Sequence, residues 1–161
     1  LSELESGARV VVLGATEVRP VLEEALGELR ERAERAAVGL ELVCDPDVRL
    51  RVRPRMLRVI ALNLAENAIR YAGPGATFTL EVARRPDGSI VLSGRDDGIG
   101  VEEAELPRLF ERFYRSDRAR ASRGTGLGLA IVKHVVTQAG GHVEAHGGRG
   151  RGLEIRCAFP G

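Results

Sequence analysis

NLAENAIRY, residues 63–71, is the stretch of this 161-residue chain from which the fold can be worked out. Apolar residues recur every three or four positions over residues 57–68, which is the pattern of a helix with one buried face. Pro54 suits the first turn of such a helix, because an N–H group there has no intrahelical acceptor in any case. A Gly-Pro-Gly sequence at 73–75 ends the pattern. We therefore expect a helix over residues 54–72.

Segments with helical or strand-like patterns lie on both sides of this helix. The expected helices cover residues 18–36, 54–72 and 126–139. The expected strands cover residues 8–13, 40–44, 48–52, 76–84, 90–95, 142–145 and 153–159. Turn sequences make 40–44 and 48–52 a hairpin or a sharp corner, and make 76–84 and 90–95 an antiparallel pair. Helices that alternate with strand pairs predict an α/β fold, a two-layer sandwich with one open face per layer.

Composition and charge bound the class of protein. Hydrophobic residues make up 43% of the chain and charged residues 29%, which is typical of a soluble globular domain. The 24 basic and 23 acidic residues nearly cancel, so no overall field favours nucleic acid or an anionic membrane surface. No apolar run approaches the roughly 18 residues that span a bilayer. Residues 1–7 have no signal-peptide pattern, and we interpret them as the end of a preceding helix.

The two cysteines, Cys44 and Cys157, lie far apart in apolar, strand-like segments. No histidine stands at ligand spacing from either of them, and two thiols alone do not complete a zinc site. We expect both to be buried free thiols, which fits a reducing, cytoplasmic setting.

Asn63, Asn67, Arg70 and Tyr71 form a polar stripe on the expected helix over residues 54–72. Asparagine in mid-helix costs about half a kcal/mol relative to alanine, so two of them require a reason. A neutral amide oxygen is a suitable Mg²⁺ ligand that does not repel phosphate. The alternative is the solvated face of a surface helix.

Asp96 opens the sequence DDGIG at residues 96–100, directly after an expected strand. A carboxylate there can accept a hydrogen bond from the exocyclic amine of adenine. Guanine presents a carbonyl at that position, so the site would favour ATP over GTP. The alternative is an ordinary Asp-Gly turn at the end of a strand.

Two further segments are suited to phosphate. GTGLGL, residues 124–129, presents backbone N–H groups at the start of a helix, without the pattern of a dinucleotide fingerprint or a P-loop. LFERFYR, residues 109–115, places Phe110 and Phe113 one helical turn apart and is followed by further arginines. It fits a lid over bound nucleotide at about residues 101–123. The alternatives are a flexible hinge and a solvated basic loop.

In order and spacing, these four segments resemble the N, G1, F and G2 boxes of the catalytic ATP-binding domain of bacterial two-component sensor histidine kinases. The resemblance covers residues 8–160 and implies the Bergerat (GHKL) fold of gyrase, Hsp90 and MutL ATPases. That fold has a mixed, mainly antiparallel sheet, three helices and a flexible ATP lid. Residues 8–161 would then form the catalytic domain, and residues 1–7 the end of a dimerisation helix or linker.

The resemblance also implies residue roles. By position, Asn67 would hold Mg²⁺, Asn63 would support the phosphates, and Asp96 would bind the adenine amine. Arg70 would reach phosphate, and Tyr71 would pack near the base. The other residues expected to line the nucleotide are Gly98, Gly100, Gly124, Thr125, Gly126, Leu127, Gly128 and Leu129.

The activity implied by the resemblance is transfer of the γ-phosphoryl group of Mg·ATP to a histidine on a separate dimerisation domain, for relay to a response regulator. Asn63, Asn67 and Arg115 would be the catalytic residues, with Arg115 at the γ-phosphate. Asn63 stands where hydrolysing relatives have glutamate, which favours transfer over hydrolysis. One departure from the family pattern is the Pro-Arg pair at residues 54–55, where an acidic residue is common.

None of the three histidines, His134, His142 and His146, lies in a phosphoacceptor motif. The acceptor histidine would therefore belong to an upstream domain of a longer parent protein. We expect this chain to be a monomer and its parent to be a homodimer. Whether the parent is anchored in a membrane stays open. Two alternatives remain: a GHKL-type serine kinase of the anti-sigma-factor class, and an ATP-binding module without catalysis.

Overall fold

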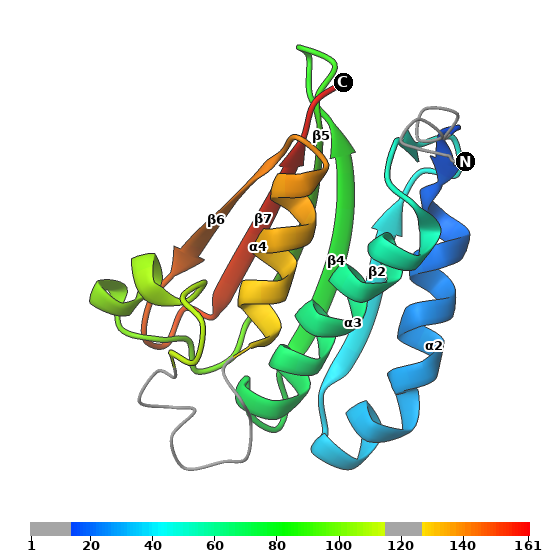
Figure 1. Cartoon of the computed structure of the whole chain (residues 1–161). Coiled ribbons are helices and arrows are strands. Elements are labelled where there is room, and N and C mark those ends of the chain that lie inside the picture. The colour runs from blue at the N-terminus through cyan, green and yellow to red at the C-terminus, as the bar shows by residue number, and fades with distance from the viewer. Residues whose placement is uncertain (1–13, 115–126) are drawn as a thin grey trace.

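The computed structural model describes residues 14–114 and 127–161. Within them, a five-stranded sheet is covered on one face by three α-helices, which makes two layers (Figure 1). The expected strand at 8–13 and the expected helix end at 1–7 lie outside the described residues. The predicted α/β sandwich is confirmed.

The sheet is mixed and mainly antiparallel, with the strand order β2-β4-β5-β7-β6. Its strands are β2 (Gly39–Cys44), β4 (Thr77–Arg84), β5 (Ile90–Asp96), β6 (His142–Gly147) and β7 (Leu153–Phe159). Among the strands within the described residues, only β2 and β4 pair in parallel, with Leu42 opposite Leu80. The predicted antiparallel pair β4–β5 is confirmed. The strands β6 and β7 are also antiparallel to each other, and β7 pairs with β5 as well.

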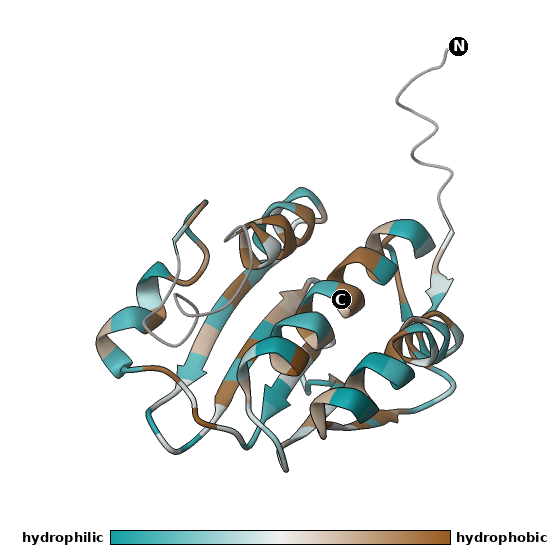
Figure 2. Cartoon of the chain, turned by 90° about the horizontal axis from the view of Figure 1, so that it is seen from below, coloured by the Kyte–Doolittle hydropathy of each residue, from teal (hydrophilic) through white to brown (hydrophobic). Residues whose placement is uncertain are grey.

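The helices are α2 (Val18–Ala36), α3 (Pro54–Tyr71) and α4 (Gly128–Gln138). Pro54 occupies the first turn of α3, as expected from its missing N–H group. Each helix carries an apolar stripe beside a polar one (Figure 2). Of the helices within the described ranges, none combines the length and the hydropathy of a membrane span.

The core lies between the helices and the sheet. Phe78 and Leu80 of β4 are buried, as are Leu22 of α2 and Leu57 and Ile60 of α3. Each such side chain contributes about 1.5–3 kcal/mol by leaving water. This layer therefore supplies most of the stability that holds α3 against the sheet.

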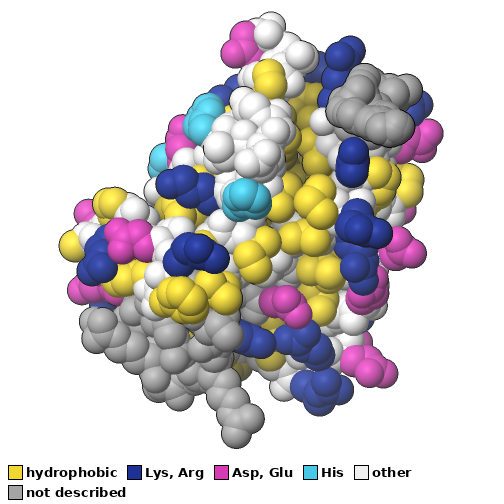
Figure 3. Space-filling view, viewed as in Figure 1, with side chains coloured by type: hydrophobic (Ala, Val, Ile, Leu, Met, Phe, Trp, Pro, Cys, Tyr) yellow, Lys and Arg dark blue, Asp and Glu magenta, His cyan; other side chains and the backbone are white. Residues whose placement is uncertain are grey.

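Ion pairs join α2 and α3 outside this core. Arg58 donates to Glu28 at 2.6 Å, and Arg32 donates to Glu66 at 2.8 Å. Basic and acidic side chains accordingly lie close to one another along this flank (Figure 3). Because these side chains are only partly buried and water still screens them, each pair contributes about 1 kcal/mol.

Of the two alternatives left open for the segments around residues 45–47, the structure shows the corner, because β2 pairs with β4 while β3 (Arg49–Leu50) pairs with β1 (Thr16–Glu17). Two other local expectations need correction. A 3₁₀-helix, η1 (Glu103–Arg108), lies where no element was expected. The helix expected from residue 126 begins at Gly128 within the described residues.

The two thiols differ in burial. Cys157 is fully buried in β7, and this burial raises the pKa of its thiol to about 12. Cys44 is only half-buried, because it ends the edge strand β2, so the expectation of full burial was wrong for it.

Candidate nucleotide-binding site

The C-terminal half of α3, the end of β5 and the start of α4 lie near one another at the lower end of the molecule (Figure 1). Two close approaches join them. A Cβ atom at Gly128 would lie 3.2 Å from Asn63 Oδ1, and a Cβ atom at Gly98 would lie 2.2 Å from the carbonyl oxygen of Ala72. The structure thus brings together three of the four segments singled out in the sequence.

Asn63 is held by its own helix. Its Nδ2 donates to the carbonyl oxygen of Val59, one turn earlier, at 2.8 Å, which leaves Oδ1 facing Gly128. Asn67 lies one turn further along α3 and is half-buried. The two amides therefore lie along the side of α3 that meets the start of α4.

The start of α4 is suited to an anion. Leu127 is its N-cap residue and makes no side-chain capping bond, and the first turn contains no acidic residue. The first backbone bond of the helix runs from Ile131 N–H to Leu127 C=O at 2.9 Å. The N–H groups of residues 128–130 thus have no partner within the helix, and such groups bind phosphate well.

Asp96 is fixed at the end of β5 by its own turn. Its Oδ1 accepts a hydrogen bond from Gly98 N–H at 2.9 Å, and its side chain is half-buried. The next residue, Asp97, accepts a bond from Thr77 N–H at 2.7 Å, which ties the turn to the start of β4. A carboxylate has two oxygens with about four acceptor sites, so it can accept more than one donor in this position.

Glycine is required at positions 98 and 100 for a structural reason that the sequence did not reveal. Gly98 packs against the end of α3, where Ile99 N–H donates to Ala72 C=O at 3.0 Å. Gly100 has a φ of +69°, and a Cβ atom there would lie 2.1 Å from the carbonyl oxygen of Gly148. Both glycines approach protein backbone, and their contact with nucleotide stays a prediction.

Arg70 and Tyr71 end α3 beside this turn; Arg70 is exposed and Tyr71 is half-buried. Ile99, which sequence reasoning missed, is 52% exposed, and its Cγ2 would lie 3.7 Å from a Cβ at Gly73. Its position between Gly98 and Gly100 was the available signal in the sequence. Ile99 gives the turn that follows Asp96 an exposed apolar side chain.

The predicted lid is described only in part. Arg115, Gly124, Thr125 and Gly126 lie outside the described residues. In the described part, Tyr114 donates to Glu105 at 2.6 Å.

The helical spacing expected for Phe110 and Phe113 was wrong. Phe113 has a φ of +64°, which a helix does not contain. The η1 helix ends before both phenylalanines, at Arg108.

Glu66, the carboxylate nearest to Asn67 in sequence, points elsewhere. It accepts a hydrogen bond from Arg32 of α2 at 2.8 Å, on the side of α3 that faces α2. Glu66 is therefore directed away from Asn67.

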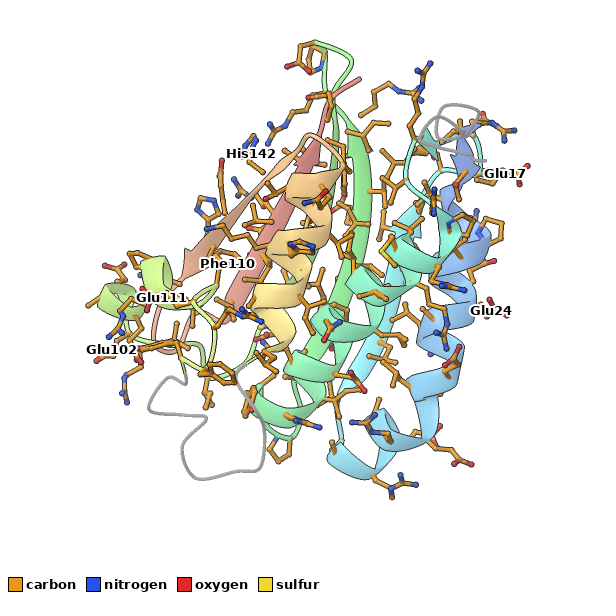
Figure 4. All side chains as sticks on the ribbon, in the orientation of Figure 1. Glu17, Glu24, Glu102, Phe110, Glu111 and His142 are labelled. Carbon is orange, nitrogen blue, oxygen red and sulfur yellow. The ribbon has the colours of Figure 1, made fainter. Side chains whose placement is uncertain are left out.

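The histidines lie on α4 and β6. Figure 4 shows His142 on β6, distant from the lower end of the molecule. His146 lies 2.9 Å from Glu144, and this contact holds the pKa of the Glu144 carboxyl below its usual range. Across residues 14–114 and 127–161, no three His, Cys, Asp or Glu side chains form a group that could hold a metal ion.

Comparison with known proteins gives a consistent result. The family described as "Histidine kinase-, DNA gyrase B-, and HSP90-like ATPase" matches residues 52–161. The sensor-like histidine kinase SenX3 of Mycolicibacterium smegmatis is 32% identical over 162 residues, which cover 99% of this chain and 42% of SenX3. The chain therefore spans less than half the length of that relative.

Two solved structures extend the comparison to the fold. The mycobacterial sensor histidine kinase MprB has a TM-score of 0.83 at 29% identity, covering 92% of this chain and 98% of that one. Full-length ShkA in complex with AMPPNP has a TM-score of 0.79 at 27% identity, covering 92% of this chain and 31% of that one.

Proposed function

We propose a function from one premise: this chain belongs to the family of histidine kinase-, DNA gyrase B- and HSP90-like ATPases. Within that family it is an ATP-binding catalytic domain of the sensor histidine kinase type. The proposed reaction is transfer of the γ-phosphoryl group of Mg·ATP to a histidine on a separate dimerisation domain of the same parent. That domain would then pass the group to a response regulator.

The observation that carries this proposal is the meeting of three different chemistries at one end of the molecule. Asp96 offers a fixed acceptor for a base, the start of α4 offers N–H groups for phosphate, and Asn63 and Asn67 offer amides between them. The solved complex of ShkA contains AMPPNP, and ShkA shares this fold. We propose that ATP lies here with its adenine at Asp96 and its phosphates at α4.

The proposed roles follow the chemistry of each group. Asn67 would hold Mg²⁺ through its amide oxygen, a hard and neutral ligand. Bound Mg²⁺ supplies positive charge that offsets the charge on the phosphate oxygens. Arg70 and Arg115 would contact phosphate, while Tyr71 and Ile99 would pack near the base.

Positioning supplies most of the catalysis in phosphoryl transfer. The bond between the γ-phosphorus and the β–γ bridging oxygen breaks, a bond to the acceptor imidazole nitrogen forms, and ADP leaves. The residues at this end have to hold the phosphates in line with that nitrogen. A general base that activates water is not needed, which agrees with Asn63 in place of a glutamate.

Transfer of radioactive phosphate tests the reaction. The chain alone should bind Mg·ATP without labelling itself, and adding the parent's histidine-bearing domain should label that domain. The product should be labile to acid and stable to base, which a phosphoserine product of the serine-kinase alternative is not. Self-labelling, or steady release of phosphate without an acceptor, would contradict the proposal.

Two variants make this test specific. Asn67→Ala should lower the transfer rate about a hundredfold, since mispositioned phosphates react slowly. Glu66→Ala is the matched control, because its carboxylate pairs with Arg32 on the side of α3 that faces α2, and it should keep the parent rate. Equal rates for both variants would remove the role of Asn67.

The role of Mg²⁺ has a separate measurement. Calorimetric titration with ATP, with and without Mg²⁺, should show that the metal strengthens binding to the parent. The gain should disappear in Asn67→Ala, while adenosine should bind as before. If Mg²⁺ strengthens ATP binding equally in both proteins, another residue is the ligand.

A further inference from the structure

We infer that the glycine-rich loop at residues 147–152, between β6 and β7, is a positioning element for Asp96. By holding the backbone of Asp96, this loop sets how strongly the site discriminates adenine from guanine. The inference rests on the proposed function, in which Asp96 reads the base. Its own support is a set of backbone contacts between the loop and residues 96–100.

The first contact lies at the end of the β5–β7 pairing, where Asp96 is opposite Leu153. The preceding residue, Gly152, has a φ of +75°. A Cβ atom there would lie 1.9 Å from the carbonyl oxygen of Asp96 and 3.1 Å from the Cα atom of Asp97. The loop backbone therefore rests directly on the peptide group that follows Asp96, with no room for a side chain.

The second contact lies at the other end of the Asp96 turn. Gly150 N–H donates to Ile99 C=O at 2.8 Å. A Cβ atom at Gly100 would lie 2.1 Å from the carbonyl oxygen of Gly148. The loop thus contacts residues 96–100 at both ends, and the turn that bears Asp96 lies between these contacts.

The loop also contains an internal hydrogen bond and forms ion pairs with residues at the start of η1. Arg151 N–H donates to Gly148 C=O at 2.9 Å, which shapes the loop from within. Arg149 pairs with Glu102 at 3.3 Å, and Arg151 pairs with Glu103. Glu102 lies at this end of the molecule (Figure 4). Exposed ion pairs contribute little by themselves, so the backbone contacts carry the positioning.

A displaced loop would affect the base more than the phosphates. A Cβ atom at residue 152 needs the Asp96 peptide to move by about 1.5 Å to reach van der Waals distance. A hydrogen bond loses most of its strength over such a displacement, because its useful range is about 2.7–3.2 Å. The start of α4 belongs to another element and keeps its place. Preference for ATP over GTP should therefore fall more than affinity for the triphosphate.

Gly150 provides a matched control within the same loop. Its φ of +78° is nearly that of Gly152, but a Cβ atom there would meet nothing within 4 Å. Alanine therefore introduces the same backbone strain at both positions. It disturbs Asp96 only at residue 152.

Calorimetry with Mg·ATP and Mg·GTP compares the two variants in the full chain. The ratio of ATP affinity to GTP affinity should fall about tenfold in Gly152→Ala, the order expected when one buried hydrogen bond is lost. It should stay within about twofold of the parent in Gly150→Ala. Equal ratios in both variants overturn the inference. A parent that binds ATP and GTP equally contradicts the proposed function instead.

Amide hydrogen exchange tests the positioning without nucleotide. The Gly98 N–H bond to Asp96 Oδ1 reports where that carboxylate lies, and its exchange should become about tenfold faster in Gly152→Ala. The Ser89 N–H bond to Asp87 Oδ1, in the β4–β5 turn, is the internal reference and should not change. Unchanged exchange at Gly98 overturns the inference even if ATP never binds.

A measurement on the parent covers the case in which Gly152→Ala does not fold. If the loop and the Asp96 turn form one unit, Mg·ATP should slow exchange of the Gly150 amide, which donates to Ile99. In a parent that calorimetry shows to bind Mg·ATP, an exchange rate at Gly150 that does not change with nucleotide overturns the inference, whereas absence of binding contradicts the proposed function.

Discussion

Two turns of this chain contain the same type of local hydrogen bond, from a backbone N–H to the aspartate two residues earlier. The packing around the two turns differs. In the β4–β5 turn, Asp87 Oδ1 accepts from Ser89 N–H at 2.8 Å. At the end of β5, Asp96 Oδ1 accepts from Gly98 N–H at 2.9 Å. The local hydrogen bond alone would rank them as equivalent Asp turns.

Their surroundings separate them. Gly88, in the first turn, has a φ of +89°, and a Cβ atom there would meet nothing within 4 Å. Gly98, in the second, is pressed against the carbonyl oxygen of Ala72. The second turn also carries the anchor from Asp97 to Thr77. The comparison teaches that packing, and not turn chemistry, marks the turn that belongs to a site.

Alanine substitution of Gly98 and of Gly88 should give the largest difference between the turns, and this difference is in the free energy of unfolding. Gly98→Ala should lower the free energy of unfolding by about 3 kcal/mol, because the new carbon overlaps backbone that cannot move freely. Gly88→Ala should cost only about 1 kcal/mol, for a positive φ in open space. Urea denaturation of both variants measures this, and equal losses would break the comparison.

Alanine at the two aspartates should separate the turns by binding. Asp96→Ala should weaken ATP binding by about 1–3 kcal/mol, the cost of leaving a buried polar partner unpaired. Asp87→Ala should leave ATP affinity unchanged, since the β4–β5 turn lies at the opposite end of β5. Titration calorimetry decides this, and an unchanged affinity in folded Asp96→Ala would remove the adenine assignment.

The anchor of the second turn should have a smaller effect. Asp97→Ala removes the acceptor for Thr77 N–H and should lower the free energy of unfolding by about 1 kcal/mol. Asp97→Asn keeps an acceptor oxygen and should restore most of that loss. Should the asparagine variant be as unstable as the alanine variant, the charge and not the hydrogen bond would be the cause.

The smallest effect concerns pH and belongs to the first turn. Hydrogen bonds from Ser89 lower the pKa of Asp87 below its ordinary value of 3.8. A lowered pKa stabilises the fold above that ordinary value, and the contribution is lost as the pH falls through the pKa of the folded state. Denaturation at pH 7 and pH 3 should therefore show the parent's small advantage over Asp87→Asn shrinking in acid. An advantage that grows in acid would reverse the sign.

Patterns that are local in sequence predicted their structure well. The helices α2 and α3, the proline that starts α3, the β4–β5 pair, and the strands β6 and β7 were all predicted from neighbouring residues. The 3₁₀-helix η1 was missed, because six residues with Pro107 inside them show no period.

Contacts between distant segments could not be predicted in the same way. Nothing near Gly39–Cys44 indicates that β2 pairs in parallel with β4, because a whole helix separates the two strands in sequence. The candidate site shows the same limit. The D-x-G-x-G spacing pointed to Asp96, but only the fold shows that Gly98 and Gly100 face Ala72 and Gly148.

The unequal burial of the two cysteines has a chemical consequence. A thiol reacts with alkylating reagents as the thiolate, so Cys157, with a pKa raised to about 12 and no exposed surface, is protected twice. Cys44, at the end of the edge strand β2, needs only local fraying to react. Iodoacetamide labelling followed by mass spectrometry would therefore measure two rates in one sample. Alkylation of Cys44 reports opening at the edge of the sheet, and alkylation of Cys157 reports global unfolding.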